Sequence, residues 1–288
     1  MNKKLCTFAF LFFYCVRAHA CDVAGIEQDA PPLCGHATQG GMLYGKVKGW
    51  DIYKAEGKEQ RAKISDNGVF VLGLDRDEPE FLKLTFCRDD KSAVCKTYTY
   101  KIIQRKYPEQ KVTVPEKFVK YSEDVQKSID RENAEIVSAR RAAAFDKSLE
   151  FTDFKSPLPL SKYQISGVFG SRRVFNGQPK SPHKGLDIAA PTGTSVNSAA
   201  PGRVIIATEM FLTGRTVFVS HGFGITSAYF HLDSIDVKKG DSVTASTVLG
   251  KVGATGRVSG AHLHFGIYHL QTALDPEILI RARTLDRV

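Results

Sequence analysis

Four of the chain's eight histidines fall in three short segments, together with one aspartate. The first segment holds His183 and Asp187, the second holds His231, and the third holds His262 and His264. Residues two apart in a strand point to the same side, so His262 and His264 would face one site about 7 Å apart. His183 and Asp187 are also an even number of residues apart. Two imidazoles and a carboxylate that converge are typical of a catalytic zinc site, whose fourth position holds water.

The first 20 residues have the pattern of a secretory signal. Lys3 and Lys4 precede an apolar run over residues 5–16, and Ala18 and Ala20 are small residues at the cleavage positions. The run is too short to span a bilayer, so we expect cleavage before Cys21 and an exported protein. An uncut signal anchor is the alternative. A lipid on Cys21 is a further alternative, but Ala18 stands where a lipoprotein signal normally has leucine.

Cysteine usage agrees with export. Beyond residue 20 the chain has four cysteines, which are Cys21, Cys34, Cys87 and Cys95. An even number in an exported protein favours two disulfides, with three possible pairings. We predict Cys21 with Cys34 and Cys87 with Cys95, because each pair closes a short local loop. All four lie upstream of the histidine segments and take no part in their chemistry.

The positive charge lies in the second half of the chain. The formal net charge is +9, and beyond the signal the whole surplus belongs to residues 151–288. A basic surface attracts anionic polymers. Export argues against nucleic acid, so a cell-wall or envelope polymer fits better, although a small surplus could equally serve solubility.

Residues 21–114 predict a small all-β domain. Short strand-like runs at 43–47, 60–64, 69–72, 81–86 and 97–103 are separated by turn signals such as Asp66-Asn67-Gly68, which suggests a sandwich. His36 stands alone in a loop there and is expected to be ordinary surface.

Residues 115–154 predict a helical linker. Ser122 can cap a helix, and Glu123 and Asp124 suit its positive N-terminal end. The apolar stripe, which includes Ile129 and Ile136, is thin and the remaining residues are mostly charged. We therefore expect a solvated connecting helix, docked on one side or bridging two domains.

Residues 155–288 return to a β pattern, so the chain as a whole is predicted to be mostly β. The strand candidates are 165–169, 202–208, 216–220, 226–231, 248–252 and 262–268. Asn176-Gly177, between Val174 and Pro179, is a strong hairpin signal.

The ordered set of site residues resembles the lysostaphin/LytM-type zinc metallopeptidases, which cut peptide bonds in peptidoglycan. The resemblance rests on His183-x-x-x-Asp187, His231-Leu232 and His262-x-His264, and on the segments at 167–172, 183–191, 237–241 and 253–256. It covers residues 160–276. The preceding β region and helix are similar to what stands before this domain in some Gram-negative exported members.

The resemblance implies an antiparallel β metallopeptidase domain with one zinc ion per chain. It makes His183, Asp187 and His264 the zinc ligands, and His231 and His262 the catalytic histidines beside the metal. Spacing alone leaves open which member of the His262/His264 pair binds zinc. Zinc would lower the pKa of a bound water to about 7, and the histidines would move its proton. The implied partners are peptidoglycan peptide stems in the periplasm, with no nucleic acid and no membrane span after signal removal. The oligomeric state is left open.

Alternative readings rest on other features. Some relatives with this fold have lost their zinc ligands and only regulate other wall enzymes, but here every site position is filled. The glycine-rich stretch 235–253 is similar to biotinyl or lipoyl carrier domains, yet no lysine stands at an exposed hairpin tip. Arg172 and Arg173 could bind substrate carboxylates or be solvated surface. His221 and His269 match no motif position and are expected to be structural.

Overall fold

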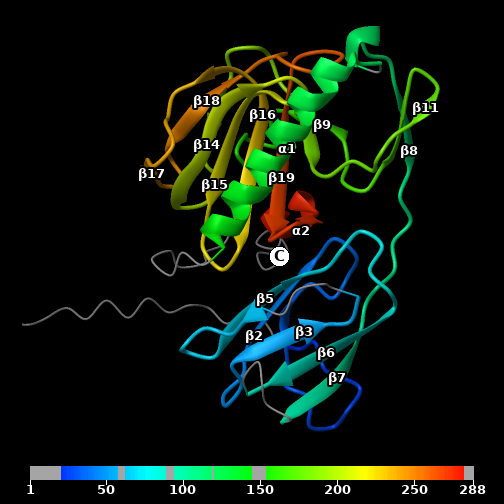
Figure 1. The fold of residues 1–288 in the computed structure, drawn as a ribbon, viewed down its shortest axis with the longest axis vertical. Coiled ribbons are helices and arrows are strands. Elements are labelled where there is room, and N and C mark those ends of the chain that lie inside the picture. Colours follow the sequence, from blue (N-terminus) through cyan, green and yellow to red (C-terminus); the bar gives the residue numbers. More distant parts are fainter. Residues whose placement is uncertain (1–20, 58–61, 89–93, 119, 145–153, 282–288) are drawn as a thin grey trace, which may run out of the picture.

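The computed structural model describes residues 21–57, 62–88, 94–118, 120–144 and 154–281, and the signal predicted over residues 1–20 lies outside them. The chain is mostly β, as predicted, with a smaller β body below a larger sheet that helix α1 crosses (Figure 1). We call residues 21–108 the N-terminal body. Neither helix in the described part of the chain combines the length and apolar composition needed to cross a membrane.

The N-terminal body contains two antiparallel sheets that share one core. The first sheet comprises β1 (Cys34–Gly35), β2 (Met42–Lys46) and β5 (Val69–Gly73), and the second comprises β4 (Ala62–Lys63), β3 (Ile52–Ala55), β6 (Phe81–Cys87) and β7 (Cys95–Lys101). Leu43 and Phe70 from the first sheet pack with Phe86 and Tyr100 from the second. Both predicted disulfides, Cys21–Cys34 and Cys87–Cys95, are confirmed.

Strand β8 (Glu109–Val112) links the N-terminal body to the rest of the chain. It pairs in parallel with β10 (Arg172–Phe175), which forms a hairpin with β11 (Gln178–Pro179). The hairpin has Val174 opposite Pro179, as the Asn176-Gly177 turn predicted. Both turn residues have positive φ, 49° and 82°, as a two-residue hairpin turn of this type requires.

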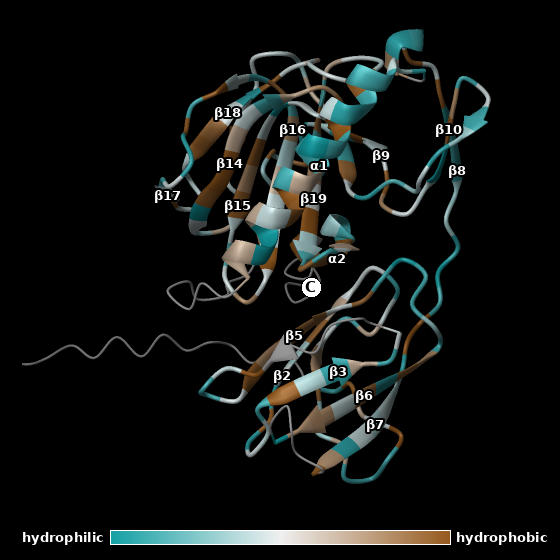
Figure 2. Ribbon diagram, in the orientation of Figure 1, coloured by the Kyte–Doolittle hydropathy of each residue, from teal (hydrophilic) through white to brown (hydrophobic). Residues whose placement is uncertain are grey.

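Helix α1 (Glu123–Ala143) follows the short 3₁₀ helix η1 (Glu116–Phe118). Ser122 is its N-cap, as predicted, because its hydroxyl accepts from the Val125 N–H at 3.4 Å. The helix is largely hydrophilic, whereas the strands behind it carry hydrophobic segments (Figure 2). Its thin apolar stripe packs Ile136 and Ala139 against residues of the large sheet such as Phe218. The helix is therefore docked along one side, which was one of the two arrangements expected.

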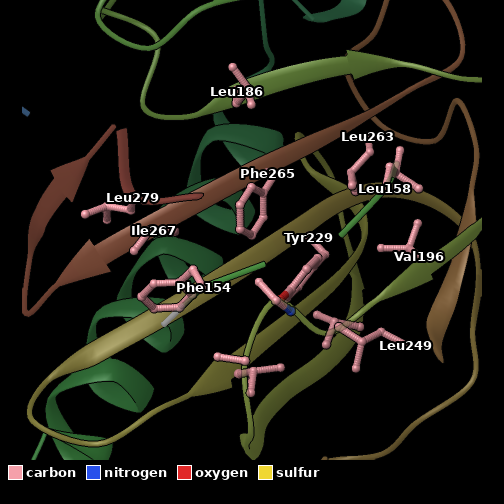
Figure 3. Close-up of a cluster of buried hydrophobic side chains, with 14 of the residues drawn as sticks. Phe154, Leu158, Leu186, Val196, Tyr229, Leu249, Leu263, Phe265, Ile267 and Leu279 are labelled. Carbon is pink, nitrogen blue, oxygen red and sulfur yellow. The ribbon is translucent and has the colours of Figure 1, made fainter. Parts of the chain in front are cut away.

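The large sheet has ten strands and carries the site. Its main path runs β17-β14-β15-β16-β19-β12-β9, with β13, β18 and β20 attached. The bounds are β9 (Gln164–Gly167), β12 (Leu186–Ala189), β13 (Ser195–Asn197), β14 (Gly202–Met210), β15 (Gly214–Ser220), β16 (Ile225–Ile235), β17 (Ser242–Val243), β18 (Val248–Val252), β19 (His262–His269) and β20 (Thr272–Leu274), followed by α2 (Pro276–Arg281). Tyr229, Leu263 and Phe265 lie in the core beneath it (Figure 3). Strands β3, β12, β13, β17 and β20 were not predicted, and each is only two to four residues long.

Candidate active site

The register of three neighbouring strands brings the predicted site residues together. Asp187 on β12 lies directly opposite His264 on β19, and His264 lies opposite Phe230 on β16. His262 precedes His264 by two residues, and both approach Asp187 Oδ1, at 3.8 Å from His262 Nε2 and 2.8 Å from His264 Nδ1. The prediction that the two histidines share a side of the strand is therefore confirmed.

Three atoms that could bind a metal ion lie close together. His183 Nε2 lies 3.0 Å from Asp187 Oδ1 and 3.0 Å from His264 Nδ1. Within the described residues, His183, Asp187 and His264 form the group with the spacing and atoms needed to hold a metal ion. Zinc ligands about 2 Å from the ion at tetrahedral angles would lie about 3.3 Å apart, close to these separations.

The hydrogen bonds behind this group fit a cation. His183 Nδ1 is 3.0 Å from the Val168 carbonyl oxygen, which can only accept, so Nδ1 carries the proton and Nε2 presents a lone pair. Asp187 Oδ1 presents further lone pairs at 3.0 Å from that nitrogen. Two acceptors that face each other at this distance repel unless a positive charge or proton lies between them. A divalent cation would satisfy all three ligands at once.

Packing fixes the plane of the His264 ring. It stacks on Phe230, with ring centroids 4.9 Å apart and an interplanar angle of 5°. A Cβ on Gly185 would lie 2.7 Å from His264 Nε2. Only glycine leaves room for the imidazole at this position, so the segment before β12 also helps to orient Nδ1 toward His183 and Asp187.

His231 and His262 form a second pair beside His183, Asp187 and His264. Their ring centroids are 4.9 Å apart, and His231 lies 6.2 Å from the His264 ring. His231 Nδ1 donates to the Thr255 carbonyl and His262 Nδ1 donates to the Gly260 carbonyl, each at 2.9 Å. In both residues these bonds leave Nε2 as the nitrogen available for chemistry.

An irregular backbone positions His231. Its φ is +64°, in the left-handed region that a residue with a Cβ seldom adopts. The register between β15 and β16 shifts at this point, and the His231 N–H donates to the Thr213 carbonyl at 2.9 Å. Such bulges redirect side chains and recur beside active sites. Here the bulge falls in the strand that carries His231 into the site.

Burial sets the charge of the site residues. Burial, reinforced by the nearby His262, lowers the pKa of His231 to about 3. Burial also lowers the pKa of His264 to about 4, although its bond to Asp187 opposes the change. For Asp187, burial acts to raise the pKa, but the close contacts with the His183 and His264 imidazoles outweigh it and hold the pKa well below its usual range. The two histidines are thus neutral near pH 7, and the carboxylate is ionised.

The five site residues line a cavity of about 550 Å³. One wall comes from four residues on a face of α1, namely Ile129, Glu132, Asn133 and Ile136, and another comes from Gln110 and Val112 on β8. Glu132 fixes the helix there, because its carboxylate oxygens accept from the Phe211 N–H at 3.1 Å. The sequence did not reveal these walls, since an amphipathic pattern shows which helix face is buried but not what it faces.

Arg173 has a partner that the sequence did not suggest. Its Nη2 donates to Asp187 Oδ2 at 2.6 Å, while the neighbouring Arg172 is exposed. Arg173 therefore contacts a carboxylate of the protein itself, through the oxygen that does not face His183 and His264. His221 is buried, with Nδ1 bonded to the Pro201 carbonyl and Nε2 paired with Ser227 Oγ, each at 2.7 Å, and takes no part in the site. His269 Nδ1 accepts from the Gly73 N–H at 3.1 Å.

Comparison with known proteins identifies similar chains. The model of peptidase family M23 matches residues 181–276. Two relatives from Vibrio cholerae, the peptidoglycan DD-endopeptidases ShyA and ShyB, are 35% and 34% identical over 127 and 140 residues. These matches cover 44% and 48% of this chain but only 27% and 30% of the relatives. The chain thus spans less than a third of each relative's length.

A solved structure extends the similarity beyond that segment. A crystal structure from Pseudomonas aeruginosa, described as a peptidase M23, has a TM-score of 0.61 and 28% sequence identity. The match covers 85% of this chain and 96% of that one, so the shared architecture includes residues outside the family segment.

Proposed function

We propose that this chain, in which residues 181–276 form a peptidase family M23 domain, is a zinc-dependent endopeptidase that hydrolyses peptide crosslinks of peptidoglycan. The observation that carries the proposal is the convergence of His183 Nε2, Asp187 Oδ1 and His264 Nδ1 within 3.0 Å of one another. Two further histidines, His231 and His262, line the same cavity.

His183, Asp187 and His264 would hold the zinc ion. They provide two neutral imidazole nitrogens and one carboxylate oxygen, a ligand set typical of catalytic zinc. When bound, zinc would lower the pKa of a water molecule and polarise the carbonyl of the peptide bond to be cut. The protein's part is to hold the ligand atoms in place, as the Val168 carbonyl does behind His183.

His262 and His231 would move the proton. The side chain of His262 is 16% exposed, the larger exposure of the two, and its Nε2 lies 3.8 Å from Asp187 Oδ1. In our proposal His262 takes the proton of the attacking water and returns one to the leaving amine. The buried His231 is neutral, so its free Nε2 can share that proton or, once protonated, stabilise the oxyanion of the tetrahedral intermediate.

The substrate and location follow from the relatives. ShyA and ShyB are named peptidoglycan DD-endopeptidases, so we propose that this chain cuts a D-alanyl crosslink between peptide stems. The signal pattern over residues 1–20 supports export, and we propose the periplasm as the place of action. The regulatory alternative, a wall-binding protein without activity, is disfavoured because the chain has a suitable residue at all three proposed ligand positions and at both proposed catalytic positions.

The test uses purified protein, purified peptidoglycan and mass analysis of the released fragments. We expect one zinc per chain, cleavage with zinc, and none after chelation. His183→Ala and His264→Ala should lose both zinc and cleavage, whereas His262→Ala should keep zinc and lose cleavage. His36→Ala, in the N-terminal body, is the control. If the zinc-saturated protein released no new peptide ends, the regulatory function would be favoured. Loss of zinc in His262→Ala would mean that His262 binds the metal and His264 moves the proton.

A further inference from the structure

The metal ligand His183 is held by a short loop, residues 168–171. Its backbone N–H donates to the Ser171 carbonyl at 3.0 Å, and its own carbonyl accepts from the Gly170 N–H at 2.8 Å. Its ring donates to the Val168 carbonyl at 3.0 Å, and that carbonyl also accepts from the Ser171 hydroxyl at 2.8 Å. Both the backbone and the ring of His183 are thus fixed by this loop.

The N-terminal body also contacts this loop, through Arg76 and Tyr107. Arg76 Nε donates to the Gly170 carbonyl at 2.7 Å. The Arg76 guanidinium lies 4.4 Å from the centroid of the Tyr107 ring, which meets Phe169 edge to face with centroids 6.2 Å apart. Arg76 and Tyr107 are far from each other and from residues 168–171 in the sequence, yet they form one contact surface against this loop.

Gly170 allows this close contact. Its φ is +78°, and a Cβ built on it would lie 2.2 Å from Tyr107 Cδ1. The Tyr107 ring therefore rests directly on the loop backbone, with no side chain between them. Any displacement of the ring would be passed to the peptide units that bond to His183.

The contact surface is itself joined to the end of the large sheet. The Arg105 guanidinium lies 5.1 Å from the centroid of the Tyr107 ring and pairs with Asp275 at 2.7 Å. The side chain of Asp275 is 3% exposed, and its backbone N–H donates to the Gly40 carbonyl at 2.7 Å. These bonds connect the N-terminal body to the residue before α2, so the two halves of the molecule have little freedom to slide at this point.

No described residue of the N-terminal body lines the cavity. Among the described residues that line it, the first along the chain is Gln110, beyond the end of the N-terminal body. The contacts of Arg76 and Tyr107 reach the site through the loop behind His183 and not through the space where a substrate would bind.

We infer that Arg76 and Tyr107 are positioning residues for the metal ligand His183, so that the N-terminal β body is part of the catalytic centre's support. This inference rests on the proposed zinc function. Groups that orient a metal ligand typically change metal affinity or activity by about 10- to 100-fold when removed. Because Arg76 acts through the loop, we expect the low end of that range.

The test compares Arg76→Ala and Tyr107→Ala in the full chain with Arg88→Ala, an exposed arginine of the same body. Zinc affinity is measured by competition with a chromophoric chelator. The fluorescence of Trp50, the chain's single tryptophan, reports whether the body remains folded. We expect affinity to fall about tenfold in the first two variants and not in the third. The KM for a crosslinked peptide should stay near wild type while kcat falls, because neither residue lines the cavity.

Two conservative variants keep the inference testable if an alanine variant unfolds. Arg76→Lys retains a donor for the Gly170 carbonyl and should restore most of the zinc affinity, whereas Arg76→Gln, with a shorter side chain, should not. Wild-type zinc affinity and kcat in folded Arg76→Gln would overturn the inference and leave the proposed function standing. If the wild-type protein bound no zinc, the proposed function itself would fail.

Discussion

Arg173 gives a prediction whose size follows from the geometry of the site. Its guanidinium bonds Asp187 Oδ2 at 2.6 Å, and the two side chains are 13% and 8% exposed. With charge centres about 4 Å apart and an effective dielectric constant of about 20, their attraction is about 4 kcal/mol. Removing one partner of a buried pair costs about 3–5 kcal/mol, because the other charge is left uncompensated. Asp187 keeps two imidazole neighbours, so we expect about 3 kcal/mol for Arg173→Met without metal.

Zinc should reduce this loss. A divalent ion bound to Asp187 Oδ1 would compensate the carboxylate that Arg173 leaves behind, and we expect the loss to fall to about 1 kcal/mol. By thermodynamic linkage, the difference of about 2 kcal/mol corresponds to zinc binding about thirtyfold more tightly in the variant.

Urea unfolding measures both quantities. The free energy of unfolding is determined for wild type and Arg173→Met in excess chelator and in a fixed excess of zinc. Arg172→Met is the control, because the neighbouring arginine is exposed and should change stability by less than about 0.5 kcal/mol. An equal loss with and without zinc, or weaker zinc binding in the variant, would refute the electrostatic reasoning. Weaker binding would mean that Arg173 acts mainly by orienting Asp187.

Two further predictions concern stability at residues outside the candidate metal site. Burial lowers the pKa of His221 from 6.5 to about 4. Between these two pH values the histidine is protonated in the unfolded chain but stays neutral in the folded chain. The free energy of unfolding should therefore keep the full contribution of His221 above about pH 6.5 and lose about 3 kcal/mol toward pH 4. In urea unfolding, His221→Gln should reduce the fall in stability over this pH range by that amount. An unchanged pH dependence in the variant would contradict this. Glu132→Ala leaves the part-buried Phe211 N–H unpaired and should cost about 1–2 kcal/mol in the same assay. Glu135→Ala, exposed on the same helix, should cost less than about 0.5 kcal/mol, and equal losses in the two variants would count against the proposed role of Glu132.

Local patterns predicted the parts of the structure that depend on neighbouring residues. The period of two in a strand placed His262 and His264 on one side, and the Asn176-Gly177 pair fixed a hairpin register. Ser122 capped the helix as its side-chain chemistry requires. The disulfides were predictable because each closes a loop of 8 or 13 residues in the chain.

Features that depend on distant contacts could not be predicted in this way. The bulge that gives His231 its positive φ arises from a register shift between two long strands, and no residue type marks it. The bond from Arg173 to Asp187 depends on where β10 lies relative to β12. The contact of Tyr107 with Gly170 joins residues more than sixty positions apart. In each case the sequence supplies the side chain, while the partner is set by how the sheets pack.

The parallel pairing of β8 with β10 also defines the smallest piece of this protein that could be moved intact to another chain. All four residues of β10, from Arg172 to Phe175, lie in register with β8. A fragment cut at residue 155 would leave that side of β10 as an open edge, and unpaired edges recruit strands from other molecules and promote aggregation. A transferable fragment must therefore begin before Glu109, or the recipient must supply a replacement strand. The transferable fragment is therefore longer than residues 181–276, the segment that the family model matches.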